Sequence, residues 1–167
     1  MKHVFCVILL VMLVLTGCGT KGETFTEPVN FYYMTADITY FTAEGVIAPE
    51  VREADGQRQD YAYLLKMYLH GPESRELKNA FPLNTTLIQL ELLENAAVVT
   101  LSDQSTKLTG VDLTIACACL TATVCDMTGV TSVTIQAETQ LLDGSQSITM
   151  SKEDVLLLDG LLNSTNN

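Results

Sequence analysis

Apolar residues recur at helical spacing in one short stretch of the chain. They fall on a single helix face, at i, i+3, i+4 and i+7, as Tyr61, Leu64, Leu65 and Tyr68. Asp60 stands just before them, where its carboxylate can accept a backbone N–H and cap the helix. Gly71-Pro72 follows as a stop, because proline cannot continue a helix. The pattern therefore predicts a helix between Asp60 and Gly71.

Alternation with a period of two predicts strands elsewhere in the chain. Apolar and polar residues alternate over 88–92, Glu94-Asn95 supplies a turn, and alternation resumes over 97–101. These three pieces predict a β-hairpin. Strand composition also marks three further segments: 29–33, a less regular extended piece at 45–52, and 133–137.

A second helix is predicted to open at Asp112 and to close at Gly129. Its core stripe consists of Leu113, Ala116, Cys117, Leu120, Val124 and Met127. Between Asp112 and Asp126 there is no charged residue. The face opposite the core stripe is also apolar or small, and it comprises Ile115, Ala118, Cys119, Ala122 and Cys125.

That second face should be covered, because a surface helix normally shows charge on the side away from the core. One cover is the apolar tail of the chain itself, over 155–162. The other is a partner protein or a second copy, since small residues let a partner backbone approach closely and exposed apolar patches mark interfaces. The pattern does not separate the two, so these five residues form a candidate interaction face.

The elements follow the order strand, helix, hairpin, helix, strand. An economical packing of this order is an α+β fold, in which two helices pack on one face of a small mixed β-sheet. We expect this domain over residues 29–140, followed by a C-terminal tail, 141–167, that packs on it.

The N-terminus predicts export and lipid attachment. Positive charge in Met1-Lys2-His3 precedes an unbroken apolar run from Val4 to Leu15, which is typical of a signal peptide over residues 1–17. Leu15-Thr16-Gly17-Cys18 looks like a bacterial lipobox, in which a diacylglyceryl group is attached to Cys18. Two acyl chains anchor a protein stably, so we expect the chain at the outer face of the membrane, with residues 18–28 as a tether. No other segment is expected to span a bilayer.

Charge argues against one class of partner. Removing residues 1–17 takes away Lys2 and no acid, which leaves 8 Lys+Arg against 20 Asp+Glu, a net charge of 8 − 20 = −12. A chain this acidic should avoid nucleic acid. The acids are scattered, and they are therefore interpreted as a solvated surface.

The residues offer little for catalysis or metal binding. His70, the one histidine of the mature chain, is expected to cap a helix end or lie on the surface, and no serine sits in a nucleophile elbow. Acidic pairs such as Glu50 with Glu53 and Glu73 with Glu76 fall in expected loops. Cys117, Cys119 and Cys125 are expected as free thiols in one helix, where they cannot converge on a metal. We therefore expect no enzyme activity, no cofactor and no metal.

Four segments resemble the GerMN domain, a family named for a germination and sporulation lipoprotein of endospore-forming bacteria. Tyr63–Pro72 is similar to the family's apolar helix ending in Leu-x-Gly-Pro, and Phe81–Thr85 to its Pro-x-Gly-Thr segment before a strand. Ala97–Ser102 and Thr128–Val133 resemble its next strand and its approach to the last strand. Asn84 stands where the family usually has glycine, and the chain shows no second copy of the domain.

The resemblance implies the fold, a surface location and protein–protein contact, because the family is similar in topology to modules that stack into ring assemblies. Three hypotheses follow for the function. The first is an interaction or scaffolding module of the cell envelope, linked to sporulation or germination. The second is a lipid-anchored protein that binds a small ligand, and the third is an envelope hydrolase.

Overall fold

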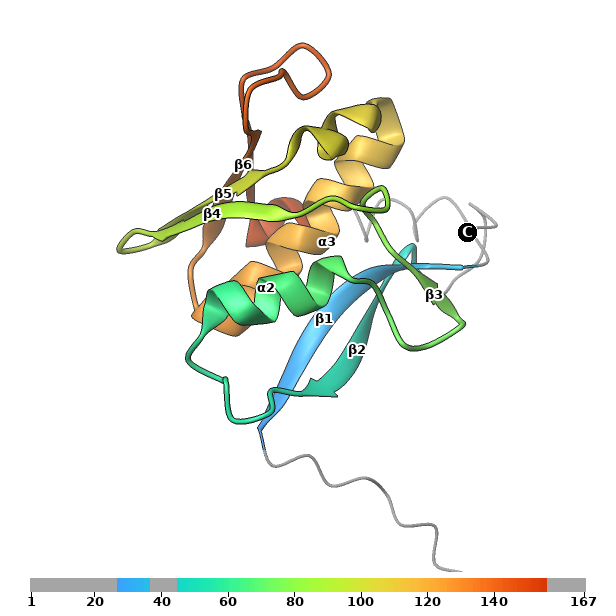
Figure 1. The fold of residues 1–167 in the computed structure, drawn as a ribbon, viewed down its shortest axis with the longest axis vertical. Helices are drawn as coiled ribbons and strands as arrows, with labels where there is room; N and C mark the ends of the chain where they lie inside the picture. The colour runs from blue at the N-terminus through green and yellow to red at the C-terminus, as the bar shows by residue number, and fades with distance from the viewer. Residues whose placement is uncertain (1–26, 37–44, 156–167) are drawn as a thin grey trace, which may run out of the picture.

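The computed structural model describes residues 27–36 and 45–155, and it contains two β-sheets (Figure 1). The larger sheet has the strand order β4-β5-β6-β7. Only β5 and β6 run parallel in it, and the other neighbours are antiparallel. Its strands are β4 (Leu87–Leu92), β5 (Ala96–Leu101), β6 (Ser132–Ala137) and β7 (Ile148–Ser151).

The smaller sheet is antiparallel and has the strand order β2-β1-β3. Its strands are β1 (Pro28–Thr35), β2 (Ile47–Glu53) and the short β3 (Leu77–Lys78). The first two predicted strands therefore belong to a second sheet, which the sequence pattern did not indicate. Strand β7 lies in the segment interpreted as a tail, and it adds a fourth strand to the larger sheet.

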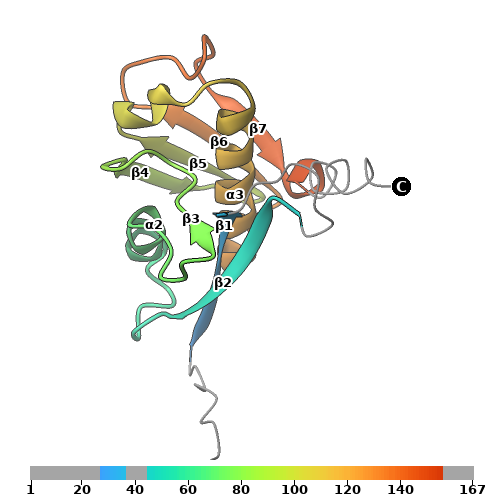
Figure 2. The ribbon, with the colours of Figure 1, turned by 90° about the vertical axis from the view of Figure 1, so that its right-hand side faces the viewer.

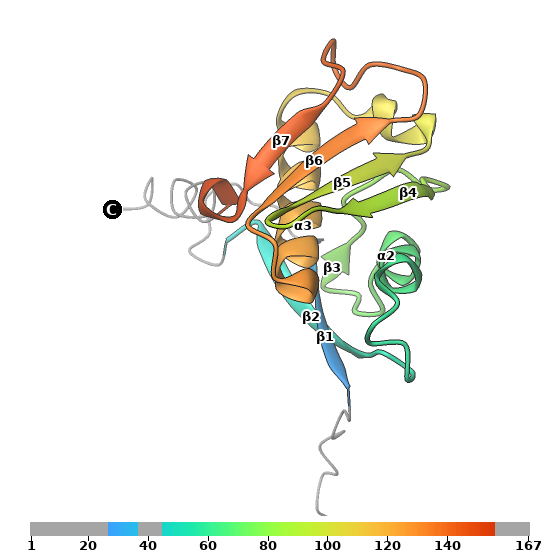
Figure 3. The same cartoon turned by 90° about the vertical axis from the view of Figure 1, so that its left-hand side faces the viewer.

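The helices α2 (Tyr61–Leu69) and α3 (Gly110–Thr128) lie on the same face of the larger sheet (Figure 3). A short 3-10 helix, η1 (Asp103–Lys107), leads from β5 to α3. Viewed from the side, α3 lies between the two sheets (Figure 2). The predicted α+β class, with two helices on one face of a mixed sheet, is confirmed.

Local sequence signals account for most element ends. The Asp60 carboxylate accepts a hydrogen bond of 2.9 Å from the backbone N–H of Tyr63 and caps α2 as predicted. Gly129 closes α3 with a φ of 84°, which glycine adopts without strain. Helix α3 begins at Gly110, two residues before the predicted start at Asp112. The predicted hairpin is confirmed, and the N–H of Leu93 donates to the carbonyl of Ala96 across its turn.

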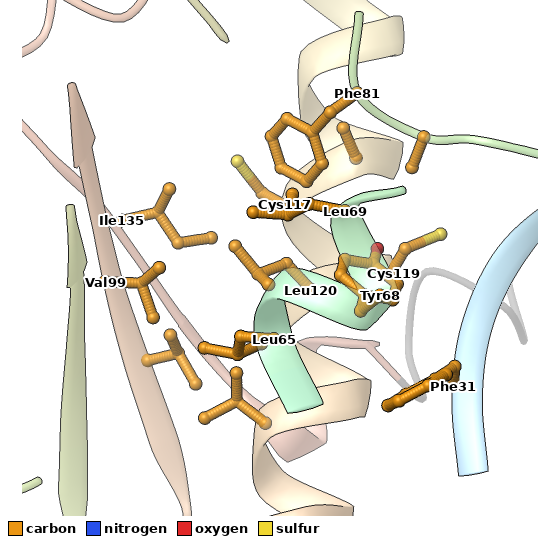
Figure 4. Close-up of a cluster of buried hydrophobic side chains, with 14 of the residues drawn as sticks. Phe31, Leu65, Tyr68, Leu69, Phe81, Val99, Cys117, Cys119, Leu120 and Ile135 are labelled. Carbon is orange, nitrogen blue, oxygen red and sulfur yellow. The ribbon is translucent and has the colours of Figure 1, made fainter. Parts of the chain in front are cut away.

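The core lies between the larger sheet and the two helices. Alternate residues of β5 and β6 point into it, as Ala97, Val99 and Leu101 do from β5. Figure 4 shows Val99 and Ile135 facing Leu120 of α3 and Leu65 of α2. Leu65 and Leu120 have no exposed area, which places both predicted stripes in the core.

The second face of α3 is an internal packing surface, which corrects the candidate interaction face. Ile115, Ala118, Cys119 and Cys125 are at most 3% exposed, while Ala122 is half-buried. Strand β1 lies along this side, where the backbone N–H of Tyr32 donates to the Thr123 hydroxyl at 2.9 Å.

A partner protein is therefore not needed to bury this face. Of the proposed covering tail, only Val155 is among the described residues, and it is buried. Residues 156–162 lie outside the described residues.

The same packing explains the composition of α3. By length and hydropathy alone, α3 could cross a membrane, which the sequence analysis did not anticipate. Two-thirds of its apolar window is buried inside the domain, as expected for a helix enclosed by two sheets. Its lack of charge is thus a property of a core helix.

Truncation of either core leucine tests this packing. We expect Leu65→Ala and Leu120→Ala each to lower the free energy of unfolding by roughly 2–5 kcal/mol, because each leaves a cavity in a filled core. Chemical denaturation measures the change. Leu83→Ala is the matched control, since Leu83 is 80% exposed and should change stability by less than about 0.5 kcal/mol. Equal effects at all three sites would contradict the assigned core.

Candidate functional site

A cleft of about 440 Å³ opens between the last turn of α2 and the segment that leads into β4. Helix α2 contributes Lys66, Leu69 and His70 to its walls. The opposite wall is the continuous segment from Leu83 to Leu87. Lys66 and His70 are exposed, whereas Leu69 is buried and forms part of the floor.

Side-chain hydrogen bonds hold the end of α2. His70 Nδ1 lies 2.7 Å from the Lys66 carbonyl oxygen, so this nitrogen carries a proton and donates. The Asn79 amide donates to the Leu69 carbonyl at 2.9 Å. Gly71 has a φ of 101°, and a Cβ there would stand 3.3 Å from the Asn79 amide nitrogen. Glycine is needed at 71, and the predicted cap role of His70 is confirmed.

The opposite wall is also fixed locally. The Thr85 hydroxyl is buried and donates to the Pro82 carbonyl at 2.8 Å, while the Thr86 N–H donates to the Ser102 hydroxyl at 3.0 Å. Asn84 has a φ of 67°. Asparagine adopts this left-handed conformation more readily than other residues with a side chain, which explains how Asn84 stands where glycine is usual.

The lining groups suit binding better than covalent chemistry. Lys66 supplies the only formal charge among the residues that line the cleft, and no carboxylate or thiol lies among them. His70 already uses Nδ1 on a backbone carbonyl, and no lining residue orients its other nitrogen. The cleft can bind an apolar group on its floor and an anion at Lys66.

Exposed apolar side chains occur along the chain from the cleft wall to the hairpin turn after β4. Leu83 is 80% exposed, Leu93 56%, Ile88 46% and Leu92 45%. They account for four of the eight large apolar residues that are exposed within the described parts of the chain. Where exposed apolar side chains form one patch, they commonly mark a binding surface.

The acidic pairs considered from the sequence have structural roles. The Glu50 carboxylate accepts hydrogen bonds from the backbone N–H groups of Glu73 and Ser74. Glu73 also pairs with Arg52 at 3.2 Å. These contacts tie the loop after α2 to strand β2, in which Glu50 and Glu53 lie, rather than in the expected loop.

The other predicted site residues do not meet at the cleft. Cys18, the expected lipidation site, lies outside the described residues. Cys117, Cys119 and Cys125 are free and buried, as expected. Within the described ranges, no group of three or more His, Cys, Asp or Glu side chains is placed to hold a metal ion.

Burial should make the α3 thiols unreactive. Removal from water raises the pKa of Cys117 to about 12, and it raises the pKa of Cys119 further and that of Cys125 less. Only the thiolate reacts with maleimide. We therefore expect slow labelling of the native chain even at pH 9, and fast labelling of all three thiols in denaturant. Mass spectrometry counts the labels, and rapid native labelling of Cys119 would contradict its enclosure under β1.

The fold is that of a small α+β domain with a core helix enclosed by two sheets. The Germane family, described as "Sporulation and spore germination", matches residues 30–143. This match spans more than half of the chain, and the chain belongs to this family. The resemblance found from the sequence is thereby confirmed.

Solved structures share the fold at low identity. The first GerMN domain of the sporulation protein GerM from Bacillus subtilis is 13% identical, with a TM-score of 0.51, over 75% of this chain and 99% of that one. The tandem GerMN domains of the same protein are 13% identical, with a TM-score of 0.52, over 78% of this chain and 47% of that one.

A protein of Clostridium perfringens provisionally named a lipoprotein is 21% identical, with a TM-score of 0.46, over 79% of this chain and 91% of that one. Among curated proteins, none matches this chain.

The cleft brings together the two segments that resemble the family most specifically. Lys66, Leu69 and His70 belong to the segment 63–72, and Leu83 to Thr85 belong to the segment 81–85. Sequence reasoning found both segments but did not place them opposite each other. Neither the helical period of 63–70 nor the composition of the loop at 81–85 indicates how close the two segments lie in the fold.

Proposed function

We propose that this chain is a non-catalytic interaction module, held at the outer face of the cell membrane by a lipid on Cys18. The exposed apolar side chains along 83–93, a segment that begins at the wall of a cleft, carry the proposal. A partner that covers them would explain why a domain with a net charge of −12 after processing exposes them. Membership of a sporulation and germination family extends the proposal to those processes.

A second candidate is the binding of a small ligand. The cleft volume of about 440 Å³ falls within the range of small-molecule sites, roughly 300–1,000 Å³. Its apolar floor and single cation would suit an amphiphilic anion. The exposed residues beyond the cleft, Ile88, Leu92 and Leu93, favour a larger partner, because a small ligand would leave them in water.

Site-specific photo-crosslinking in the native host tests the proposal. A benzoylphenylalanine is placed at Leu83 or Leu93 of the full chain, and at Leu141 or Val111 as controls of similar exposure elsewhere on the domain. We expect the first two positions to form a discrete adduct with an envelope protein in the membrane fraction, and the control positions to form none. The absence of adducts at Leu83 and Leu93, or equal adducts at all four positions, would contradict the proposed function.

If the host forms spores, the same strains give a physiological measurement. Replacement of both Leu83 and Leu93 by glutamate should reduce the yield of heat-resistant spores while the protein level, measured by immunoblot, stays constant. Glutamate at Leu141 is the matched control.

A further inference from the structure

The outer edge of β4 is open within the described parts of the chain. Strand β4 ends the order β4-β5-β6-β7 and pairs only with β5. Leu93 donates to Ala96 across the hairpin, and antiparallel pairs alternate between bonded and unbonded. Glu91 and Gln89 therefore direct their backbone groups toward β5, whereas Leu90 and Leu92 direct theirs outward. Such an edge is a template for a further strand.

The cleft lies at the beginning of this edge. Leu87 is the first residue of β4, and it also lines the cleft. Figure 1 shows α2 running alongside β4, and Leu69 at the end of α2 lines the same cleft as Leu87. At about 3.3 Å per residue, the edge from Leu92 to Leu87 accommodates an added strand of about five or six residues.

Charge favours one kind of occupant. Lys66 is the only formally charged residue that lines the cleft, on a protein that is otherwise strongly acidic. Charges more than about 8 Å away are largely screened at physiological salt. The Lys66 ammonium therefore determines which sign of charge the cleft prefers to bind. A carboxylate at Lys66 would gain a partner, whereas a lysine or arginine there would meet a like charge.

We propose that the edge of β4 binds an extended segment of a partner protein as an added strand, whose acidic end lies in the cleft against Lys66. Backbone hydrogen bonds at Leu90 and Leu92 give the affinity, as in other cases of strand addition. An apolar side chain of the partner rests on the cleft floor at Leu69 and Leu87. This inference rests on the proposed function, to which it adds a binding mode and the chemistry of the partner.

Selection from a displayed library of random peptides of about eight residues, followed by synthesis of the enriched peptides, tests this mode on the full chain purified in detergent. We expect enriched peptides to alternate apolar residues and to carry Asp, Glu or a free C-terminal carboxylate at one end. Their binding should weaken as salt is raised. Lys66→Glu should weaken binding by about tenfold or more. Lys152→Glu makes the same charge change at the opposite edge of the sheet, and it should change binding by less than about twofold.

Amide hydrogen exchange distinguishes strand addition from contact by side chains alone. Peptide binding to the unmodified chain should slow exchange at Leu90 and Leu92, because their N–H groups acquire acceptors. Three results would each overturn the inference: no enrichment of acidic peptides, equal binding by the Lys66→Glu and Lys152→Glu chains, or unchanged exchange at both leucines.

The two proposals can fail separately. If the crosslinking positions capture an envelope protein in cells and Lys66→Glu leaves this capture unchanged, the interaction function stands and strand addition at an acidic end is wrong. If acidic peptides bind as expected but no adduct forms in cells, the binding mode stands and the interaction function is wrong.

Discussion

Replacement of Cys119 by arginine is expected to destabilise the fold strongly, with a loss of unfolding free energy of about 3–5 kcal/mol or more. Cys119 has no exposed area and lies beside Tyr68, under strand β1 (Figure 4). A guanidinium at this position would be a buried charge without a partner. A domain of this size has about 5–15 kcal/mol of stability in total, so a loss of this size removes a large part of it.

The matched control is Val111→Arg, which makes a similar change on the same helix. Val111 is 62% exposed in the first turn of α3, so we expect a loss below about 1 kcal/mol. Circular dichroism with urea titration measures both variants. A folded Cys119→Arg chain with normal stability would mean that β1 does not enclose α3, and it would restore a partner protein as the cover of that face.

Part of the packing around α3 could be predicted from the sequence. The absence of charge between Asp112 and Asp126 indicated correctly that the helix is covered on all sides. This prediction was possible because the polarity of each helix face can be derived from a short stretch of sequence. The identity of the cover could not be predicted. Tyr32 and Thr123, whose hydrogen bond joins β1 to α3, are 91 residues apart in sequence, and no local pattern connects them.

The predicted strands are present, but their division between two sheets was missed for a related reason. The hairpin of β4 and β5 was predictable because alternation and the turn at Glu94-Asn95 lie within one short stretch. The division of strands between two sheets depends on tertiary packing, and the 29–33 segment has the same composition in either sheet. Strand β7 contains Ile148 and Met150 among Ser and Thr residues, and so short a run gives little periodic signal.

The candidate cleft was less predictable than the core. Buried residues such as Leu65 can be recognised in the sequence because apolar residues recur at helical spacing. The cleft is lined largely by exposed residues, whose spacing follows no fixed pattern. The resemblance to a family marked the segments around Lys66 and Asn84, and the structure supplied their relation. The left-handed φ of Asn84 also explains a departure from the family that the sequence alone could only note.

The other large effect is expected at Cys18. Cys18→Ser should move the protein out of the membrane fraction, or leave it as an uncleaved precursor, because the acylated thiol is the only durable anchor proposed for the chain. Metabolic labelling with a fatty acid such as palmitate should fall to background. Cys6→Ser is the matched control: Cys6 lies inside the apolar run of the expected signal peptide, so its loss should leave labelling and processing unchanged.

The position of Cys18 gives this result a structural consequence. Strand β1 begins at Pro28, ten residues after Cys18, so an anchored domain lies at most about 35 Å from the membrane surface. Strand β1, the first strand in the described part of the chain, is also the strand that encloses α3. If the Cys18→Ser chain still incorporates fatty acid, or if its processing is unchanged, the lipobox interpretation is wrong. Partners would then be sought among soluble extracellular proteins instead of membrane proteins.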